Sequence, residues 1–415
     1  MPKKSKSKLL FVGSAGCAFE QIPCKSSGKQ GRDKKEKDKK SKKKRVTKVM
    51  FEPRSAEKEL RMNKLVRKIP GSESWAITWE NQCTSPDYQK LEQISDMNEC
   101  IAKKNKRREA KQSLRKSRSK TSSRRKLLAR SKKLTKQKNY QMLQGLYGGI
   151  PASQMMSRIF QRPSDFNHRA FLKNFKFMFQ ALRPLFLGIS ELQKHGYCHN
   201  DLLSRNVLFD ENTSQFKMID FGLSFDINQV LKDVRRYKLK SKPRYEWTEL
   251  LKNKSKYSSQ VFARMTKEFL NDRIYTAYPF DYLYFGITAE EIESEIDDIE
   301  TGFHLIHYED YYEFVHKGIF HRDVDSLRLT MLDNIMDLKI EDVLRKVDVY
   351  SLGMFVFELL IDVTDALVIP DTELLQLFTI EALKPHLHLL RDMTEFNPRE
   401  RISGDEAYKR YMRLI

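Results

Sequence analysis

The residues best suited to chemistry lie close together in the middle of the chain. His199, Asp201 and Asn206 form an H-x-D-x-x-x-x-N pattern, and Asp220 follows in Asp-Phe-Gly, 14 residues after Asn206. Moving a phosphoryl group requires a carboxylate that orients the accepting hydroxyl, and ligands for metal ions. Asp201 supplies the carboxylate, while Asn206 and Asp220 supply oxygen ligands for Mg²⁺, the only metal expected here. The pattern therefore predicts phosphoryl transfer.

A phosphate site also needs a cation, and Lys48 is the candidate. It lies within the apolar run V-T-K-V, where a lysine needs an anionic partner. Glu59 is the predicted partner because it shares a helix face with apolar residues, whereas Glu57 lies on a charged face. Lys43 and Lys44 are close in the sequence and stay open as alternatives.

A glycine-containing turn near the N-terminus is the candidate phosphate cradle, because glycines let backbone amides approach an anion. The turn holds two of the three glycines of a G-x-G-x-x-G loop, with Phe11 in place of the first. A plain hairpin turn without a ligand is the alternative. The residues assigned to nucleotide binding, together with Lys48, are Leu10, Gly13, Ser14, Ala15, Gly16 and Ala18.

Two kinds of element must position these residues. Up to residue 149, short apolar runs broken by Gly and Pro predict a hairpin over 8–24, further strands, and a helix from Ser55 to Pro70. Later, apolar residues at helical spacing predict one buried helix over 171–196 and a nearly all-apolar helix over 348–363. The fold class expected is α+β, with a small, mainly β part over 8–149 and a larger, mainly α part over 150–415.

These motifs resemble the protein kinase family, and the resemblance implies a bilobal fold that uses ATP, Mg²⁺ and protein substrates. By resemblance, Asp201 matches the catalytic base, Asn206 and Asp220 match the Mg²⁺ ligands, and His199 matches a structural histidine. Asp348 in D-V-Y-S-L-G resembles the aspartate that enters the central helix and binds the catalytic-loop backbone. In this reading, Lys48 and Glu59 form the lysine–glutamate pair of the small lobe.

Other positions match loosely or depart from the family. Arg401 in N-P-R-E-R-I-S resembles the buried arginine that pairs with the glutamate of A-P-E. This chain has no A-P-E, and Asp281 is the candidate substitute, with a plain turn as the alternative. Asn200 replaces the arginine of H-R-D, which makes control by activation-loop phosphorylation doubtful. Leu203 replaces the usual Ser/Thr-kinase lysine, and Arg205 follows it, as in tyrosine kinases.

The whole pattern resembles serine/threonine protein kinases encoded by large cytoplasmic DNA viruses of the iridovirus kind. The shared features are the G-S-A-G-C…P-C opening, the lysine-rich insertion before Lys48, and the N-P-R-E-R-I-S ending. The resemblance implies transfer of the γ-phosphate of Mg·ATP to protein hydroxyls, with Ser/Thr favoured and tyrosine or dual specificity left open. It also implies the host cytoplasm, with the nucleus or the virion as alternatives.

The formal charge of +22 is concentrated in two low-complexity segments. Residues 25–48 contribute +10 and residues 101–139 contribute +17, so the remainder carries 22 − 27 = −5. Basic insertions are therefore predicted at 25–45 and 101–139, where they can touch nucleic acid nonspecifically or dock acidic or nucleic-acid-associated substrates. A pseudokinase, or a basic protein that tethers nucleic acid on a kinase scaffold, is the alternative function.

Composition predicts an intracellular protein without a membrane segment. No apolar run reaches the roughly 18 to 20 residues that span a bilayer, and the start of the chain lacks a secretory signal pattern. The five cysteines are scattered, odd in number and without a C-x-x-C pair. They are therefore expected to be free thiols.

Overall fold

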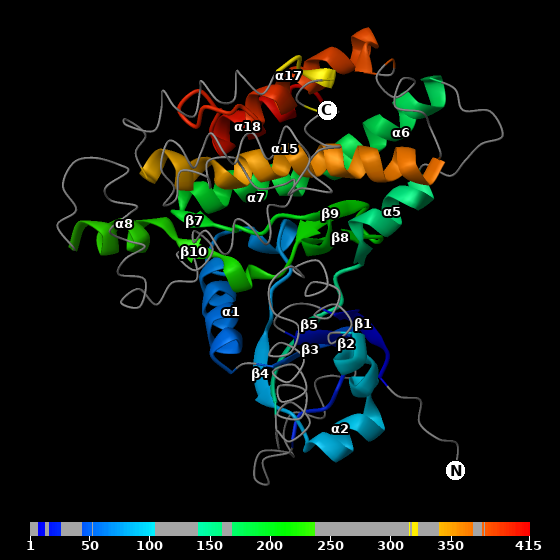
Figure 1. Cartoon of the computed structure of the whole chain (residues 1–415), viewed down its shortest axis with the longest axis vertical. Coiled ribbons are helices and arrows are strands. Elements are labelled where there is room, and N and C mark those ends of the chain that lie inside the picture. Colours follow the sequence, from blue (N-terminus) through cyan, green and yellow to red (C-terminus); the bar gives the residue numbers. More distant parts are fainter. Residues whose placement is uncertain are drawn as a thin grey trace, which may run out of the picture. The chain divides into compact units, whose positions relative to one another are not determined.

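The chain folds into two compact units with helices and strands in both (Figure 1), consistent with the α+β class. One unit contains residues 1–67 and 77–147, and the other contains residues 68–76 and 148–415. The computed structural model describes residues 7–12, 16–25, 44–51, 53–103, 140–159, 168–236, 315, 318–322, 340–367, 376 and 378–415.

The first unit is built on a five-stranded antiparallel sheet in the order β1-β2-β3-β5-β4. The predicted hairpin and the strand that carries Lys48 are present. Strand β4 and helix α2 lie in the stretch 72–100, where the sequence pattern was too mixed to predict either. The strands are β1 (Leu9–Val12), β2 (Gly16–Glu20), β3 (Arg45–Met50), β4 (Asn81–Thr84) and β5 (Gln141–Leu146).

The two faces of this sheet pack against different helices. Because side chains alternate along a strand, Lys48 and Val49 point to opposite faces. Met50 on the Lys48 face packs against α1 (Pro53–Val66). Val49 lies in a larger core with Leu91 of α2 (Tyr88–Ile94). Helix α1 begins at Pro53 rather than at Ser55, because proline is tolerated in the first helical turn.

Four of the five cysteines form disulfides in the first unit, so the prediction of five free thiols is wrong. Cys17 pairs with Cys100, and Cys24 pairs with Cys83. Cys198, in the second unit, is buried and forms no disulfide with the other four cysteines, all of which the structure describes. The partners are 83 and 59 residues apart in sequence. Cys17 lies in β2 and Cys83 in β4, whereas Cys100 lies in a helical segment that follows α2. Cysteine number and local spacing carry no information about such contacts.

A short segment of the N-terminal half belongs to the second unit. Residues 68–76, which include the 3₁₀ helix η2 (Ser72–Ser74), pack with residues 148–415. The backbone N–H of Met218 donates to the carbonyl of Trp75 at 2.9 Å, and Gly188 lies against the fully buried Trp75 ring. Residues 68–76 therefore lie in a different compact unit from most of the range 8–149 that was expected to form the small, mainly β part.

The second unit is mainly helical, with two small sheets, and the candidate catalytic residues lie in the segments that connect their strands. Figure 1 shows the long helix α15 (Ile340–Leu367) running beside α7 (Arg183–Lys194). Side chains around much of α15 are buried, as expected for a central helix. The remaining helices are α5 (Ala152–Ile159), α6 (His168–Ala181), α8 (Ile227–Arg236), α17 (Lys384–Met393) and α18 (Gly404–Met412).

The predicted single helix over 171–196 is wrong, because the chain breaks into α6 and α7 at Leu182. Pro184 lies in the first turn of α7, where its missing N–H costs no helical hydrogen bond. Helix α7 ends before Gly196, which has a positive φ of 73°.

Among the helices that the structure describes, none combines the length and the apolar character that a membrane span requires.

Candidate active site

The segment after β7 (Tyr197–Cys198) is held by the carboxylate of Asp348 in α15. Its Oδ2 accepts from the backbone N–H of His199 at 2.6 Å, and its Oδ1 accepts from that of Asn200 at 2.8 Å. Asn200 has a φ of 60°, a strained conformation for a residue with a side chain. The two charge-assisted bonds offset this strain and fix the loop that carries Asp201.

His199 connects the loop to the strand that precedes Asp220. Its Nδ1 accepts from the backbone N–H of Asp201 at 3.3 Å, so its Nε2 carries the proton and donates to the carbonyl of Ile219 at 3.0 Å. The ring is fully buried and packs edge-on against Phe221. The ring therefore connects the loop rigidly to the strand before Asp220, in keeping with the structural role predicted for it.

Asn206 lies at the end of a 3₁₀ turn, η3 (Ser204–Asn206), and its side chain is buried. Its Nδ2 donates to the carbonyl of Asp201 at 2.7 Å, which directs the amide oxygen away from that bond. Strands β8 (Val207–Asp210) and β9 (Gln215–Met218) then form the predicted hairpin. The N–H of Ile219 donates to the carbonyl of Asn206 at 2.9 Å, so Asp220 returns close to Asn206 in the chain path.

Asp220 adopts a left-handed conformation with a φ of 64°. Its carboxylate accepts from the N–H of Gly222 at 3.4 Å, and its side chain is half-buried. Local bonding of this kind lets aspartate occupy the left-handed region. The Asp-Phe-Gly segment turns sharply here and continues into β10 (Phe225–Asp226), which pairs with β7.

Asp201, the predicted catalytic base, is 5% exposed. Arg205 approaches its Oδ1 at 3.4 Å, and Arg205 itself is partly exposed. Because the Arg205 guanidinium lies beside the Asp201 carboxylate, it can help to hold the orientation of that side chain. The remaining geometry of the loop comes from its backbone bonds.

Several residues that support this loop were missed at the sequence level. Ser204 donates its hydroxyl to Glu358 of α15 at 2.7 Å, and its N–H also donates to that carboxylate at 3.2 Å. Ser224 donates its hydroxyl to the carbonyl of His199 at 3.0 Å. Glu358 is a charged residue within a hydrophobic helix. Its position was the signal in the sequence for a buried polar partner.

In the first unit, the predicted contact between Lys48 and Glu59 is present. The Lys48 Nζ lies 2.9 Å from both carboxylate oxygens, and the side chains are 9% and 1% exposed. Glu57 is exposed, as its charged helix face predicted. Lys44 is also exposed and lies over the Tyr147 ring, so it is a poor alternative to Lys48.

Two further residues, not predicted from sequence, hold Glu59 in place. Trp79 donates its Nε1–H to the Glu59 carboxylate at 2.5 Å. Asn63 accepts the backbone N–H of Trp79 at 2.8 Å and donates to the backbone carbonyl of Glu59 at 2.6 Å. The carboxylate thus keeps partners besides the lysine, which a buried charge requires.

The candidate nucleotide-binding residues are placed only in part. Gly13, Ser14 and Ala15 lie outside the described residues. Gly16 is in β2, where a Cβ would fall 2.1 Å from the carbonyl oxygen of Val49. A glycine is therefore required there by the close approach of β3, whether or not phosphate binds.

Ala18 lies directly opposite Lys48 in the β2–β3 pairing, and Phe11 lies opposite Ala18. Residues opposite one another share a face of the sheet, so these three side chains line one row. Leu10, 41% exposed, is in the same edge strand as Phe11, which is 37% exposed. These exposed side chains leave apolar surface at the edge of the sheet.

Arg401 is buried, as expected from N-P-R-E-R-I-S, but its candidate partner Asp281 lies outside the described residues. Its Nε donates to the carbonyl of Glu395 at 2.8 Å, and its guanidinium lies over the Tyr350 ring. Arg322, which was not predicted, pairs with the Glu395 carboxylate at 2.6 Å. Burial lowers the pKa of Arg322.

The comparison with protein families agrees with this geometry. Residues 173–294 match the family model described as protein tyrosine and serine/threonine kinase. A search of the curated proteins found no match. The family match covers the Asp201 loop and the Asp-Phe-Gly segment and supports a protein kinase. It does not distinguish tyrosine from serine/threonine specificity, and the resemblance to viral enzymes stays a prediction.

Proposed function

We propose that this chain is an ATP-dependent protein kinase that transfers the γ-phosphate of Mg·ATP to protein hydroxyls, with Ser/Thr favoured. The observation that carries the proposal is the braced loop around Asp201. Three independent polar contacts, from Asp348, His199 and Asn206, fix the backbone on both sides of this carboxylate. Such positioning is the main contribution that a protein makes to phosphoryl transfer.

In the proposed reaction, the Asp201 carboxylate orients the substrate hydroxyl and accepts its proton as the oxygen attacks phosphorus. Asp201 is fit for this role because its backbone is fixed while Arg205 lies beside one carboxylate oxygen. A general base must hold its acceptor oxygen within hydrogen-bond reach of the hydroxyl. The loop geometry supports this requirement.

The ligands proposed for Mg²⁺ are the amide oxygen of Asn206 and the carboxylate of Asp220. Both are hard oxygen donors, which Mg²⁺ prefers, and the bond from Asn206 Nδ2 to Asp201 orients the amide. The bound metal would neutralise phosphate charge. In the described ranges, no group of three or more His, Cys, Asp or Glu side chains forms another candidate metal site.

The first unit would contribute the phosphate-binding cation. Lys48 is buried and held by Glu59, so its ammonium group has a defined position. A lysine in this setting can bind phosphate as a point charge. In the proposed reaction, Lys48 would bind phosphate groups of ATP, with nucleotide contacts from Leu10, Ala18 and the glycine turn.

The acceptor residue is proposed from resemblance to viral serine/threonine kinases. Leu203 and Arg205 resemble the tyrosine-kinase arrangement instead, so phosphotyrosine is the competing outcome. A test must therefore identify the phosphorylated amino acid as well as the activity.

The proposal is tested by transfer of radiolabelled phosphate from Mg·ATP to a mixed protein substrate, followed by phosphoamino-acid analysis. Asp201→Asn keeps the shape of the side chain and removes the base, so the rate should fall by roughly 10² to 10⁴-fold. Lys44→Ala, at an exposed lysine outside the pair, is the control and should keep the wild-type rate. A folded wild-type protein that transfers no phosphate would instead support a pseudokinase or a tether.

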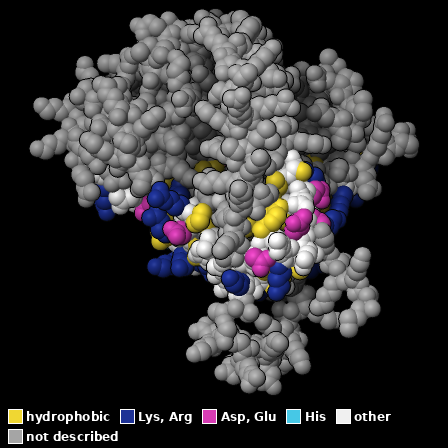
Figure 2. Space-filling model, turned by 60° about the horizontal axis from the view of Figure 1, so that its bottom comes forward, with side chains coloured by type: hydrophobic (Ala, Val, Ile, Leu, Met, Phe, Trp, Pro, Cys, Tyr) yellow, Lys and Arg dark blue, Asp and Glu magenta, His cyan; other side chains and the backbone are white. Residues whose placement is uncertain are grey.

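The charges on one face of the described residues bear on the nucleic-acid alternative. Figure 2 shows Lys and Arg side chains interspersed with Asp and Glu on the described part of this face. On that part, the mixture of charges differs from the single-sign stripe expected of a nucleic-acid footprint. Contact through the basic insertions stays a proposal. Deleting 26–43 and 104–139 separates the two functions, because a kinase should keep catalysis and a tether should lose binding.

A further inference from the structure

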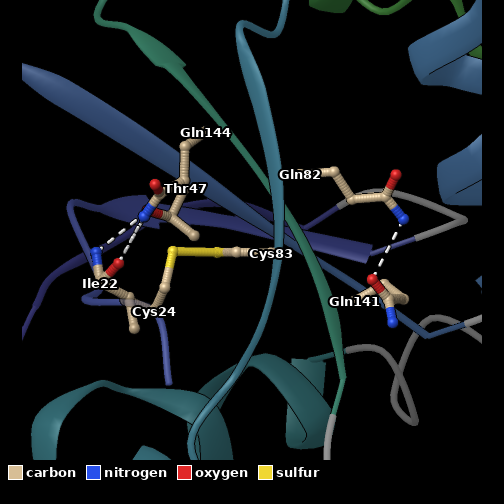
Figure 3. Close-up of a disulfide and its surroundings, with 7 residues drawn as sticks. All are labelled: Ile22, Cys24, Thr47, Gln82, Cys83, Gln141 and Gln144. Carbon is tan, nitrogen blue, oxygen red and sulfur yellow. Dashed lines mark hydrogen bonds between the residues drawn. A yellow bond between two sulfur atoms is a disulfide. The ribbon is translucent and has the colours of Figure 1, made fainter. Parts of the chain in front are cut away.

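The Cys24–Cys83 disulfide fastens a short strap across the back of the strand that carries Lys48. The strap consists of residues 21–25, which follow β2. Figure 3 shows the disulfide beside the polar contacts that the strap makes with two strands. The buried side chain of Ile22 anchors the strap in the core of the first unit.

The strap is bonded to three neighbouring strands. On β3, the Thr47 hydroxyl accepts from the N–H of Ile22 at 3.0 Å. On β5, Gln144 donates its side-chain amide to the carbonyl of Ile22 at 2.7 Å. On β4, the disulfide joins Cys83, and the N–H of the strap residue Lys25 donates to a backbone carbonyl at 2.9 Å.

This arrangement couples the disulfide to Lys48 through Thr47, the preceding residue of β3. Thr47 and Val49 point to the strap face, whereas Lys48 points to the face covered by α1. The strap therefore supports the backbone on both sides of Lys48 without touching its side chain. Loosening it would let β3 move and would change the position of the ammonium group.

The two disulfides differ in accessibility. Cys17 and Cys100 are fully buried, whereas Cys24 and Cys83 are half-buried. Thiol–disulfide exchange requires an attacking thiolate to reach a sulfur atom. A reductant in solution should therefore reach the strap disulfide before the core disulfide.

We propose that the Cys24–Cys83 disulfide is a reversible redox latch that holds the Lys48 strand in place. The reductant is a dithiol, which supplies two electrons. Its thiolate attacks one sulfur, which breaks the protein S–S bond and forms a mixed disulfide. Its second thiol then displaces the protein sulfur, so the reductant leaves as a disulfide and Cys24 and Cys83 become two protonated thiols. For kinase activity, the proposal rests on the proposed function.

The first test follows reduction itself. The full-length protein is equilibrated with increasing dithiothreitol, and alkylation with mass spectrometry reports each cysteine. Cys24 and Cys83 should be modified at a lower dithiol concentration than Cys17 and Cys100. Simultaneous modification of all four would overturn the latch, because the two bonds would then open only when the unit unfolds.

The second test asks whether the open latch loosens β3. Amide hydrogen exchange at Lys48 and Val49 should become at least about tenfold faster when only Cys24–Cys83 is reduced. The melting temperature should fall by about 5 to 10 °C. Both values should recover on reoxidation. Unchanged exchange in β3 after selective reduction would overturn the proposal.

Two variants complete the design. Cys24→Ser with Cys83→Ser should match the reduced wild type without added dithiol, and Gln82→Ala, an exposed change beside Cys83, should match the oxidised wild type. If the double variant does not fold, reversible reduction of the wild type still decides the question. Phosphate transfer, measured in parallel, should fall on reduction and return on oxidation. Absence of transfer in both states would count against the kinase, while exchange in β3 would still test the latch.

Discussion

The carboxylate of Asp348 accepts the backbone N–H of His199 at 2.6 Å, across 149 residues of sequence. A second bond to Asn200 completes the attachment of the loop to α15. The loop that carries Asp201 therefore takes its shape from a helix that lies far along the chain.

Asp348→Asn should reduce both stability and phosphate transfer. The amide retains one acceptor oxygen, so one of the two buried N–H groups loses its partner at a cost of about 1–3 kcal/mol. Urea denaturation measures this loss, and the rate of transfer should fall while the affinity for ATP changes little. Equal losses of stability and ATP affinity, with a normal rate for the bound enzyme, would contradict a role confined to the loop.

The buried Lys48–Glu59 pair should show strong coupling in a double-mutant cycle. Lys48→Met or Glu59→Gln alone removes the opposite charge from beside a buried charged group, at a cost of about 3–5 kcal/mol. The double variant should be more stable than the sum of the single changes indicates. Denaturation of all four proteins measures the coupling. Additive losses would show that the two side chains do not stabilise each other.

Gly16→Ala should destabilise the first unit for a structural reason. Its Cβ would lie 2.1 Å from the Val49 carbonyl oxygen, so β2 and β3 would have to separate. Thermal unfolding should occur at a lower temperature even without nucleotide. Gly71→Ala is an informative comparison, because no atom lies within 4 Å of that site but its φ is 73°. A normal melting temperature for Gly16→Ala would place the role of this glycine in ligand binding alone.

His386 should make stability depend on pH. Burial against the Phe175 and Phe179 rings holds the pKa of His386 below its ordinary value of 6.5. The unfolded chain therefore binds more protons than the folded chain just below pH 6.5, and stability falls as the pH falls through this window. The slope is at most about 1.4 kcal/mol per pH unit. His386→Phe should flatten it, and an unchanged slope would assign the dependence to other groups.

Short-range spacing in the sequence was enough to predict how the candidate catalytic residues lie relative to one another. His199, Asp201, Asn206 and the Asp-Phe-Gly segment occur within 24 residues, so their spacing alone indicated a loop and a returning hairpin. The partner choice of Glu59 over Glu57 also followed from helix periodicity, because neighbouring positions on a helix point in different directions. These inferences needed only short-range geometry.

Contacts between residues that are distant in the sequence became known only from the tertiary structure. No local pattern relates the segments that are joined by the cysteine pairs, by the Trp79 bond to Glu59, and by the backbone bond between Trp75 and Met218. The predicted single helix over 171–196 is two helices that meet at Leu182, with Pro184 in the first turn of α7. The hydrophobic periodicity continues through this break, so it did not reveal the break. Spacing along a chain specifies which groups are neighbours in sequence, whereas the folding of the sheet and of α15 determines which buried polar groups meet.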